Sequence, residues 1–167
     1  MIEKVFNTQN GVIHYRTSIV SGERTWLVFL PGLTADHRLF EKQIEEFKDD
    51  YNLFVWDAPG QGCAETEYGR QLMYAMLDTY TKREYCELAS HGFRILAEAI
   101  EADLAYEISC PALLICGEKD KAGFTKRYNA AWANQSGLPI RWIPGAGHNS
   151  NTDKPELVNS VIREFLR

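Results

Sequence analysis

Apolar residues in this chain form short continuous runs between segments of helical period. WLVFL at 26–30 fits a strand buried on both faces of a parallel sheet, because no polar residue interrupts it. Two further segments, VFN at 5–7 and VIHYRT at 12–17, flank Asn10-Gly11, which supplies the positive φ angles of a tight hairpin turn. The chain therefore begins with a predicted hairpin. The other runs that predict strands are NLFVWD at 52–57, ALLIC at 112–116 and PIRWI at 139–143.

Helical periodicity separates these runs. Asp36 can cap a helix over about 37–48, in which Phe40, Ile44 and Phe47 share one face. Strand, helix and strand joined by short links imply a right-handed crossover between parallel strands. No strand signal occurs over about 66–104, where apolar residues repeat helically and Gly92 predicts a break. This stretch is predicted to be a block of helices.

The C-terminal third returns to alternating strands and helices. A helix over about 124–136 is predicted to end at Gly137, and another to follow Pro155, a residue favoured in a first turn. The last helix is expected to bury Val158, Val161, Ile162 and Phe165. The order of elements predicts one α/β layered domain over residues 1–167, with a helical segment at 64–106 inserted in it.

Composition excludes several classes of protein. The 167 residues carry a net charge of −5 and no basic cluster, so nucleic acid is not an expected partner. No apolar run approaches the roughly 18 residues of a membrane span, and the first residues lack the apolar run of a secretory signal. The four cysteines form no C-x-x-C pair, which fits reduced thiols in a cytoplasmic protein. They are Cys63, Cys86, Cys110 and Cys116.

Four local motifs, in this order, resemble those of the α/β-hydrolase superfamily, and of its cap-bearing serine hydrolases in particular. Each contains the end of a predicted strand and the turn after it, and the order and spacing carry the resemblance more than any single motif. It implies a partial α/β-hydrolase fold: a mostly parallel sheet flanked by helices, with residues 64–106 as a cap-like segment. The motifs are LVFLPGLTAD at 27–36, VWDAPGQG at 55–62, LLICGEKD at 113–120 and IPGAGHNSN at 143–151.

The resemblance also implies the residues of a site. Asp120 stands where the family keeps its catalytic acid, and His148 where it keeps its catalytic histidine. A carboxylate that accepts from imidazole Nδ1–H fixes the tautomer and supports the imidazolium formed during acyl transfer. The turn at Gly32 and Leu33 implies backbone donors for an oxyanion, with the Leu33 N–H as the better candidate.

The family's nucleophile motif, G-x-S-x-G, is absent. Ser90 and Ser136 each have one glycine nearby at the wrong offset and no buried strand before them. Cys63 follows a predicted strand end, but nothing near it in sequence would lower its thiol pKa, so it is interpreted as a junction residue and not a substitute nucleophile. The simplest account is an internal deletion near Gly62-Cys63 that removes the central nucleophile strand and its neighbours.

Loss of a central strand would leave two half-sheets. Either they pair directly, or each exposes an edge through which the chain self-associates. The chain is accordingly interpreted as derived from a serine hydrolase acting on esters or similar small acyl substrates, and as inactive or severely weakened. Two alternatives stay open: a non-catalytic protein that binds small apolar ligands or a partner, and a deletion product that does not fold stably.

No cofactor and no metal is expected. The remaining histidines show neither i, i+4 nor metal-ligand spacing. His14 is expected on a strand surface, His37 in the first turn of a helix and His91 in a loop.

Overall fold

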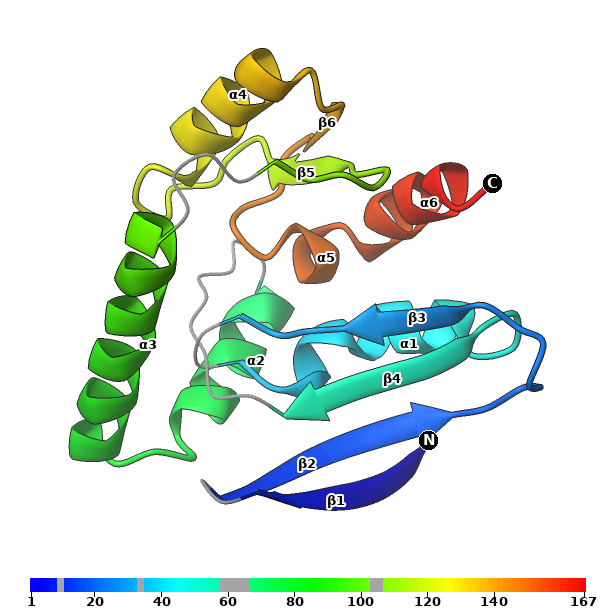
Figure 1. The fold of residues 1–167 in the computed structure, drawn as a ribbon, viewed down its shortest axis with the longest axis vertical. Helices are drawn as coiled ribbons and strands as arrows, with labels where there is room; N and C mark the ends of the chain where they lie inside the picture. The colour runs from blue at the N-terminus through cyan, green and yellow to red at the C-terminus, as the bar shows by residue number, and fades with distance from the viewer. Residues whose placement is uncertain (9–10, 33–34, 58–66, 103–106) are drawn as a thin grey trace.

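A computed structural model describes residues 1–8, 11–32, 35–57, 67–102 and 107–167 (Figure 1). The strands are β1 (Ile2–Thr8), β2 (Gly11–Ser18), β3 (Trp26–Phe29), β4 (Asn52–Asp57), β5 (Leu114–Gly117) and β6 (Ile140–Ile143). The helices are the 3₁₀ helix η1 (His37–Phe40) and α1 (Glu41–Phe47), α2 (Glu67–Leu77), α3 (Lys82–Ala102), α4 (Thr125–Ser136), α5 (Ser150–Asp153) and α6 (Pro155–Phe165).

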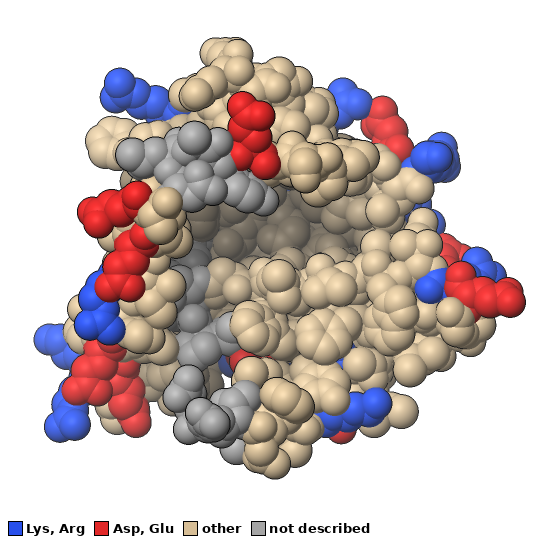
Figure 2. Space-filling model, in the orientation of Figure 1, with Lys and Arg blue, Asp and Glu red and all other residues tan. Residues whose placement is uncertain are grey.

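The described strands form two separate sheets. One has the order β1-β2-β4-β3, with the hairpin and β2–β4 antiparallel and β3–β4 parallel; the other is the parallel pair β5–β6. The predicted hairpin and the predicted parallel crossover are both confirmed. In Figure 1 the two sheets lie on either side of α5, and the molecular surface is hollowed between them (Figure 2). The two half-sheets therefore do not pair directly, and self-association through their edges stays a prediction.

One face of the four-stranded sheet carries the N-terminal core. Leu53 and Val55 of β4 and Phe47 of α1 are completely buried. The ring of Phe29 in β3 lies 5.1 Å from that of Phe40 in η1. Asp36 caps η1 as predicted, since its side chain accepts from the Arg38 amide, although the first turn is 3₁₀ before it becomes α-helical. Apolar burial on this face holds η1 and α1 against the strands.

The opposite face of the same sheet is open. Trp26, Val28 and Leu30 are all exposed large apolar side chains. The prediction that residues 26–30 are buried on both faces is wrong, because β4 is the one element, among those described, against which β3 packs extensively. A parallel pair normally has helices on both faces. The apolar residues of β3 would suit helices on both faces of the sheet, but the described helices pack against one face.

The helical segment is present but differs in detail from its prediction. α3 runs without interruption through Gly92, so the predicted break there is wrong. A glycine keeps its backbone N–H and costs only about 1 kcal/mol in a helix interior, which a long helix tolerates. Met76 of α2 is buried in a cluster with Ala35 and Leu39. The apolar residues of α3 that remain exposed are Phe93, Ile95, Leu96 and Ile100.

The C-terminal half follows its prediction closely. α4 ends at Gly137 in the left-handed conformation, with φ of 72°, and α6 begins at Pro155. Val158 is buried in a cluster with Ile143 and Ala146. Phe165 is exposed, contrary to prediction, because it lies in the last turn of α6, where the helix runs past the cluster. Among the described residues, no helix is long and apolar enough to cross a membrane.

Candidate active site

Strands β5 and β6 bring the two candidate residues together. They pair in parallel, with Gly117 opposite Ile143, so the loops that follow them leave the sheet at the same edge. The two loops are also hydrogen-bonded, because the Lys119 amide donates to the Ala146 carbonyl at 2.8 Å. A Cβ on Gly117 would lie 1.9 Å from the Gly147 oxygen. Only glycine permits this approach of the backbones.

The side chains of Asp120 and His148 meet across this junction. Nδ1 of His148 lies 2.9 Å from Oδ2 of Asp120, and the two residues are 28 positions apart. The Asp120 side chain is 2% exposed, and its other oxygen accepts from the Ala122 amide at 2.8 Å. A buried carboxylate at this distance assigns the imidazole proton to Nδ1 and leaves Nε2 as the basic atom. The His148 side chain is 30% exposed, so solvent reaches the imidazole while the carboxylate beside it is buried.

The loop that carries His148 is fixed by its own backbone bonds. The Gly147 amide donates to Oδ2 of Asp153 at 2.7 Å in a buried contact. The Asn149 carbonyl accepts from the Thr152 amide, which starts the short helix α5 directly after the histidine. The sequence predicted a loop here and not the short helix α5. The short helix restricts where the imidazole can lie.

A buried polar network ties this loop to the N-terminal half. Nε2 of Gln43 donates to the Asn151 carbonyl at 3.1 Å and to Oδ1 of Asn159 at 3.0 Å. Nδ2 of Asn151 donates to the Leu39 carbonyl at 2.7 Å. Residues of η1, α1, α5 and α6 thus share one set of hydrogen bonds. The two half-sheets are joined through these helices, and not through a strand.

The remaining predicted site residues are only partly described. Gly32 is exposed, and its carbonyl accepts from the Ala35 amide at 3.1 Å. Leu33, the preferred oxyanion donor, lies outside the described residues, as do Cys63 and the Gly62-Cys63 join. Within the described part of the chain, no hydroxyl or thiol is hydrogen-bonded to the His148 ring. The acid and the histidine come together, and the oxyanion assignment stays a prediction.

No protein-family model and no curated protein sequence matches the chain. Solved structures do match. A predicted CIB-like hydrolase from Thermoplasma acidophilum gives a TM-score of 0.61 at 17% identity, with 99% of this chain and 97% of the other covered. The fold is that of the α/β-hydrolases.

Two further structures agree with this. E-2-(acetamidomethylene)succinate hydrolase matches with a TM-score of 0.60 at 16% identity, covering 99% of this chain and 98% of its own. A thermophilic esterase from Thermogutta terrifontis matches with a TM-score of 0.58 at 15% identity, covering 99% and 97%. At these identities the similarity establishes the α/β-hydrolase fold and not a reaction. The resemblance first drawn from four motifs is confirmed at the level of fold.

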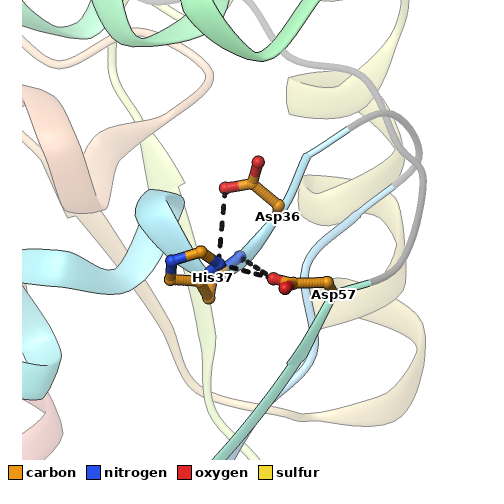
Figure 3. A group of neighbouring side chains, drawn as sticks. All are labelled: Asp36, His37 and Asp57. Atoms are coloured by element: carbon orange, nitrogen blue, oxygen red, sulfur yellow. Dashed lines mark hydrogen bonds and ion pairs between the residues drawn. The ribbon is translucent and has the colours of Figure 1, made fainter. Parts of the chain in front are cut away.

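A second cluster, not predicted from the sequence, lies at the end of β4 (Figure 3). Nδ1 of His37 lies 2.6 Å from Oδ1 of Asp57, whose other oxygen accepts from Arg16. Burial alone would raise the pKa of the Asp57 carboxyl. The hydrogen bonds from the His37 amide, from Arg16 and from the His37 ring outweigh burial, so the pKa of Asp57 lies below its usual range. Asp57 is the first residue of the D-x-P-G motif. Side chains alternate between the two faces of a strand, so the pairing of β2 with β4 was the signal that could have placed Arg16 on the same face of the sheet as Asp57.

The same cluster has donor atoms close enough to hold a metal ion, because Asp36 joins His37 and Asp57. Its charges argue against that role. Both oxygens of Asp36 accept from the Arg38 guanidinium, and Asp57 is bound by Arg16. A cation would have to displace two guanidinium groups that already neutralise the carboxylates. The cluster is an ion-pair network that fixes the end of β4.

The other polar candidates lie apart from the site. Ser90 is exposed on α3, and Oγ of Ser136 donates to the Trp132 carbonyl at the end of α4. His91 lies inside α3 and not in a loop, because that helix continues through Gly92. His14 is exposed on β2, as predicted, 3.5 Å from Glu3.

Proposed function

We propose that Asp120 and His148 are the acid–base half of an ester-hydrolysing site, and that the chain is inactive or severely weakened because it has no nucleophile elbow. One observation carries the proposal: the 2.9 Å contact between His148 Nδ1 and a carboxylate that is 2% exposed. A surface pair formed by chance would not bury its acid so completely. The α/β-hydrolase fold and the esterases among its structural neighbours support the substrate class, a small apolar acyl compound.

The dyad can act as a base. Nε2 of His148 accepts a proton from water as the water oxygen bonds to an ester carbonyl carbon, while Asp120 stabilises the imidazolium. The imidazolium then returns the proton to the departing alkoxide, so ester and water become acid and alcohol. A covalent acyl-enzyme needs a serine or cysteine beside Nε2. G-x-S-x-G is absent from the whole sequence, so that faster route is closed.

Turnover of p-nitrophenyl acetate and butyrate tests the proposal. We expect the wild-type chain to turn over below about 0.01 s⁻¹, against a typical enzyme at about 10 s⁻¹. His148→Ala should remove any part of this residual rate that exceeds the rate in buffer, and Asp120→Ala should do the same. His14→Ala, which removes an exposed histidine on the other sheet, is the matched control and should leave the rate unchanged.

Two results would count against the proposal. Turnover at or above about 1 s⁻¹ that depends on His148 would show that the site is complete. Labelling of the chain by a fluorophosphonate probe would show an activated nucleophile that the sequence does not reveal. Circular dichroism and size-exclusion chromatography on the same sample distinguish both results from a chain that has not folded.

A further inference from the structure

The open face of the four-stranded sheet can be assigned residue by residue from the strand register. Residues opposite each other in neighbouring strands point to the same face. Val28 is opposite Phe54, and Phe54 is opposite Thr17, so these side chains share the face away from α1. The stacked rings of Tyr15 and Phe54, 5.4 Å apart, confirm it. We call this the apolar face and define it by Ile2, Phe6, Tyr15, Trp26, Val28 and Phe54.

The apolar face is exposed to a degree that is unusual for such residues. Ile2, Phe6, Trp26 and Val28 are all exposed, and they come from both outer strands of the sheet. Figure 1 looks onto this face, with α1 behind the strands, and Figure 2 shows the surface over β3 and β4 largely free of charged side chains. A contiguous apolar patch of this kind on a folded protein marks an interaction surface.

We propose that the apolar face packs against the same face of a second copy of this chain, forming a two-fold symmetric dimer in which two sheets stack. Sheets stack face to face at about 10 Å with side chains interdigitating. A two-fold dimer uses one self-complementary patch twice. The aromatic and aliphatic residues of the apolar face satisfy this requirement, because no polar group on one copy needs a specific partner on the other.

The distribution of charge supports a second copy. Lys4 is the single charged side chain on this face among the strand residues that the structure describes, and it lies on β1 at the margin. A two-fold axis parallel to the strands places β1 of one copy over β3 of the other. Since β3 carries no charge, each Lys4 then meets uncharged residues and the two lysines lie at opposite margins. Like charges would not face each other.

The size of the face also fits a dimer. The strands β1, β2, β4 and β3 have 7, 8, 6 and 4 residues, which at about 3.3 Å each and about 4.8 Å between strands cover roughly 400 Å² in projection. Two copies would bury about 800 Å² before the relief of the side chains is counted. Stable interfaces bury about 1,200–2,000 Å² in total and transient ones bury less, so the face suits a weak, concentration-dependent dimer. A sheet edge, the other candidate for self-association, offers only one row of backbone groups.

Two valines on opposite faces of the same sheet provide the test. Val28 on the apolar face is 56% exposed and Val5 on the opposite face is 54% exposed, so Val28→Lys and Val5→Lys make the same chemical change at equal exposure. At about 100 µM, light scattering should give wild type and Val5→Lys about twice the 19.1 kDa of the chain. Val28→Lys should be monomeric, with at least a tenfold weaker dimer. Circular dichroism should show all three folded.

Tryptophan fluorescence gives an independent measurement. Trp26 lies on the apolar face, and its emission should shift to shorter wavelength as wild type is concentrated from about 1 to 100 µM, but not in Val28→Lys. A monomeric wild type at 100 µM would overturn the proposal, even if the face bound another protein. Equal disruption by Val5→Lys and Val28→Lys would also overturn it, because the assembly would then not depend on this face.

Discussion

Nε2 of Gln43 donates to Oδ1 of Asn159 at 3.0 Å, joining residues 116 positions apart. The Gln43 side chain is 1% exposed, so this hydrogen bond and its neighbours form away from water. In most layered α/β proteins a continuous sheet relates one half of the chain to the other. Here the sheet is interrupted, and buried amides between α1 and α6 take that role. The position of His148 relative to the N-terminal strands thus depends on them.

Gln43→Leu should lower the free energy of unfolding by about 2–4 kcal/mol. The change keeps a side chain of similar size but leaves the Asn151 carbonyl and Oδ1 of Asn159 without the donor they have now, and unpaired buried groups cost about 1–3 kcal/mol each. Urea unfolding followed by circular dichroism measures it. Glu45→Ala, which removes an exposed ion pair with Lys48 on the same helix, should cost less than about 0.5 kcal/mol. Equal effects would contradict the assigned role of Gln43.

Asp120→Asn should change the tautomer of His148. The carboxylate holds the proton on Nδ1, whereas an amide can donate to Nδ1 and move the proton to Nε2. Ring ¹⁵N chemical shifts of His148 at neutral pH report which nitrogen carries the proton. The readout needs no substrate, so it tests the dyad even in an inactive protein. Unchanged ring ¹⁵N shifts in the variant would contradict the contact between His148 Nδ1 and Asp120 Oδ2.

Gly117→Ala should destabilise the C-terminal half by more than about 3 kcal/mol, because the new Cβ would lie 1.9 Å from the Gly147 oxygen. The loops that hold Asp120 and His148 would have to separate. Gly32→Ala is the matched control, since a Cβ there meets nothing within 4 Å. Thermal unfolding of the two variants should differ clearly. A Gly117→Ala protein as stable as wild type would show that the loops are not in contact.

Asp57→Asn should destabilise the protein at pH 7 by about 1.5–3 kcal/mol, the usual value of hydrogen bonds to a charged group. The pKa of Asp57 is lower in the folded chain than in the unfolded chain, so its contribution is complete above the ordinary carboxyl pKa of about 3.9. It is lost as pH falls through the folded value. The stability difference between wild type and variant should therefore shrink below about pH 4, as urea unfolding from pH 7 to pH 3 would show. A constant difference would contradict the ion-pair network.

Local patterns in the sequence predicted most of the elements, and the resemblance to the α/β-hydrolases implied the contact of Asp120 with His148. The parallel pairing of β3 and β4, the glycine end of α4 and the start of α6 at Pro155 all follow from short-range chemistry. The meeting of Asp120 with His148 follows from two strands that end at one edge of a sheet. These features need only nearby residues to be specified.

The incorrect predictions concern which other elements pack against a given strand or helix. Nothing local in WLVFL says that its second face is open, because the same residues would suit a covered strand. Gly92 carried a weak helix penalty that the rest of α3 overcame. The cluster of Asp57 with His37 and Arg16 was missed because it joins three separate segments. Sequence periodicity gives the direction of a side chain but not its partner.

Asp120 and His148 lie 28 positions apart, and the hydrogen bonds that join their two loops come from residues after 116, while Gln43 of α1 binds the Asn151 carbonyl from outside. The contact between the two side chains is thus built within one contiguous segment of the chain. A segment of this kind can keep its internal contacts when residues elsewhere in the chain change. Substitutions between β4 and α2 should therefore leave the contact of Asp120 with His148 in place.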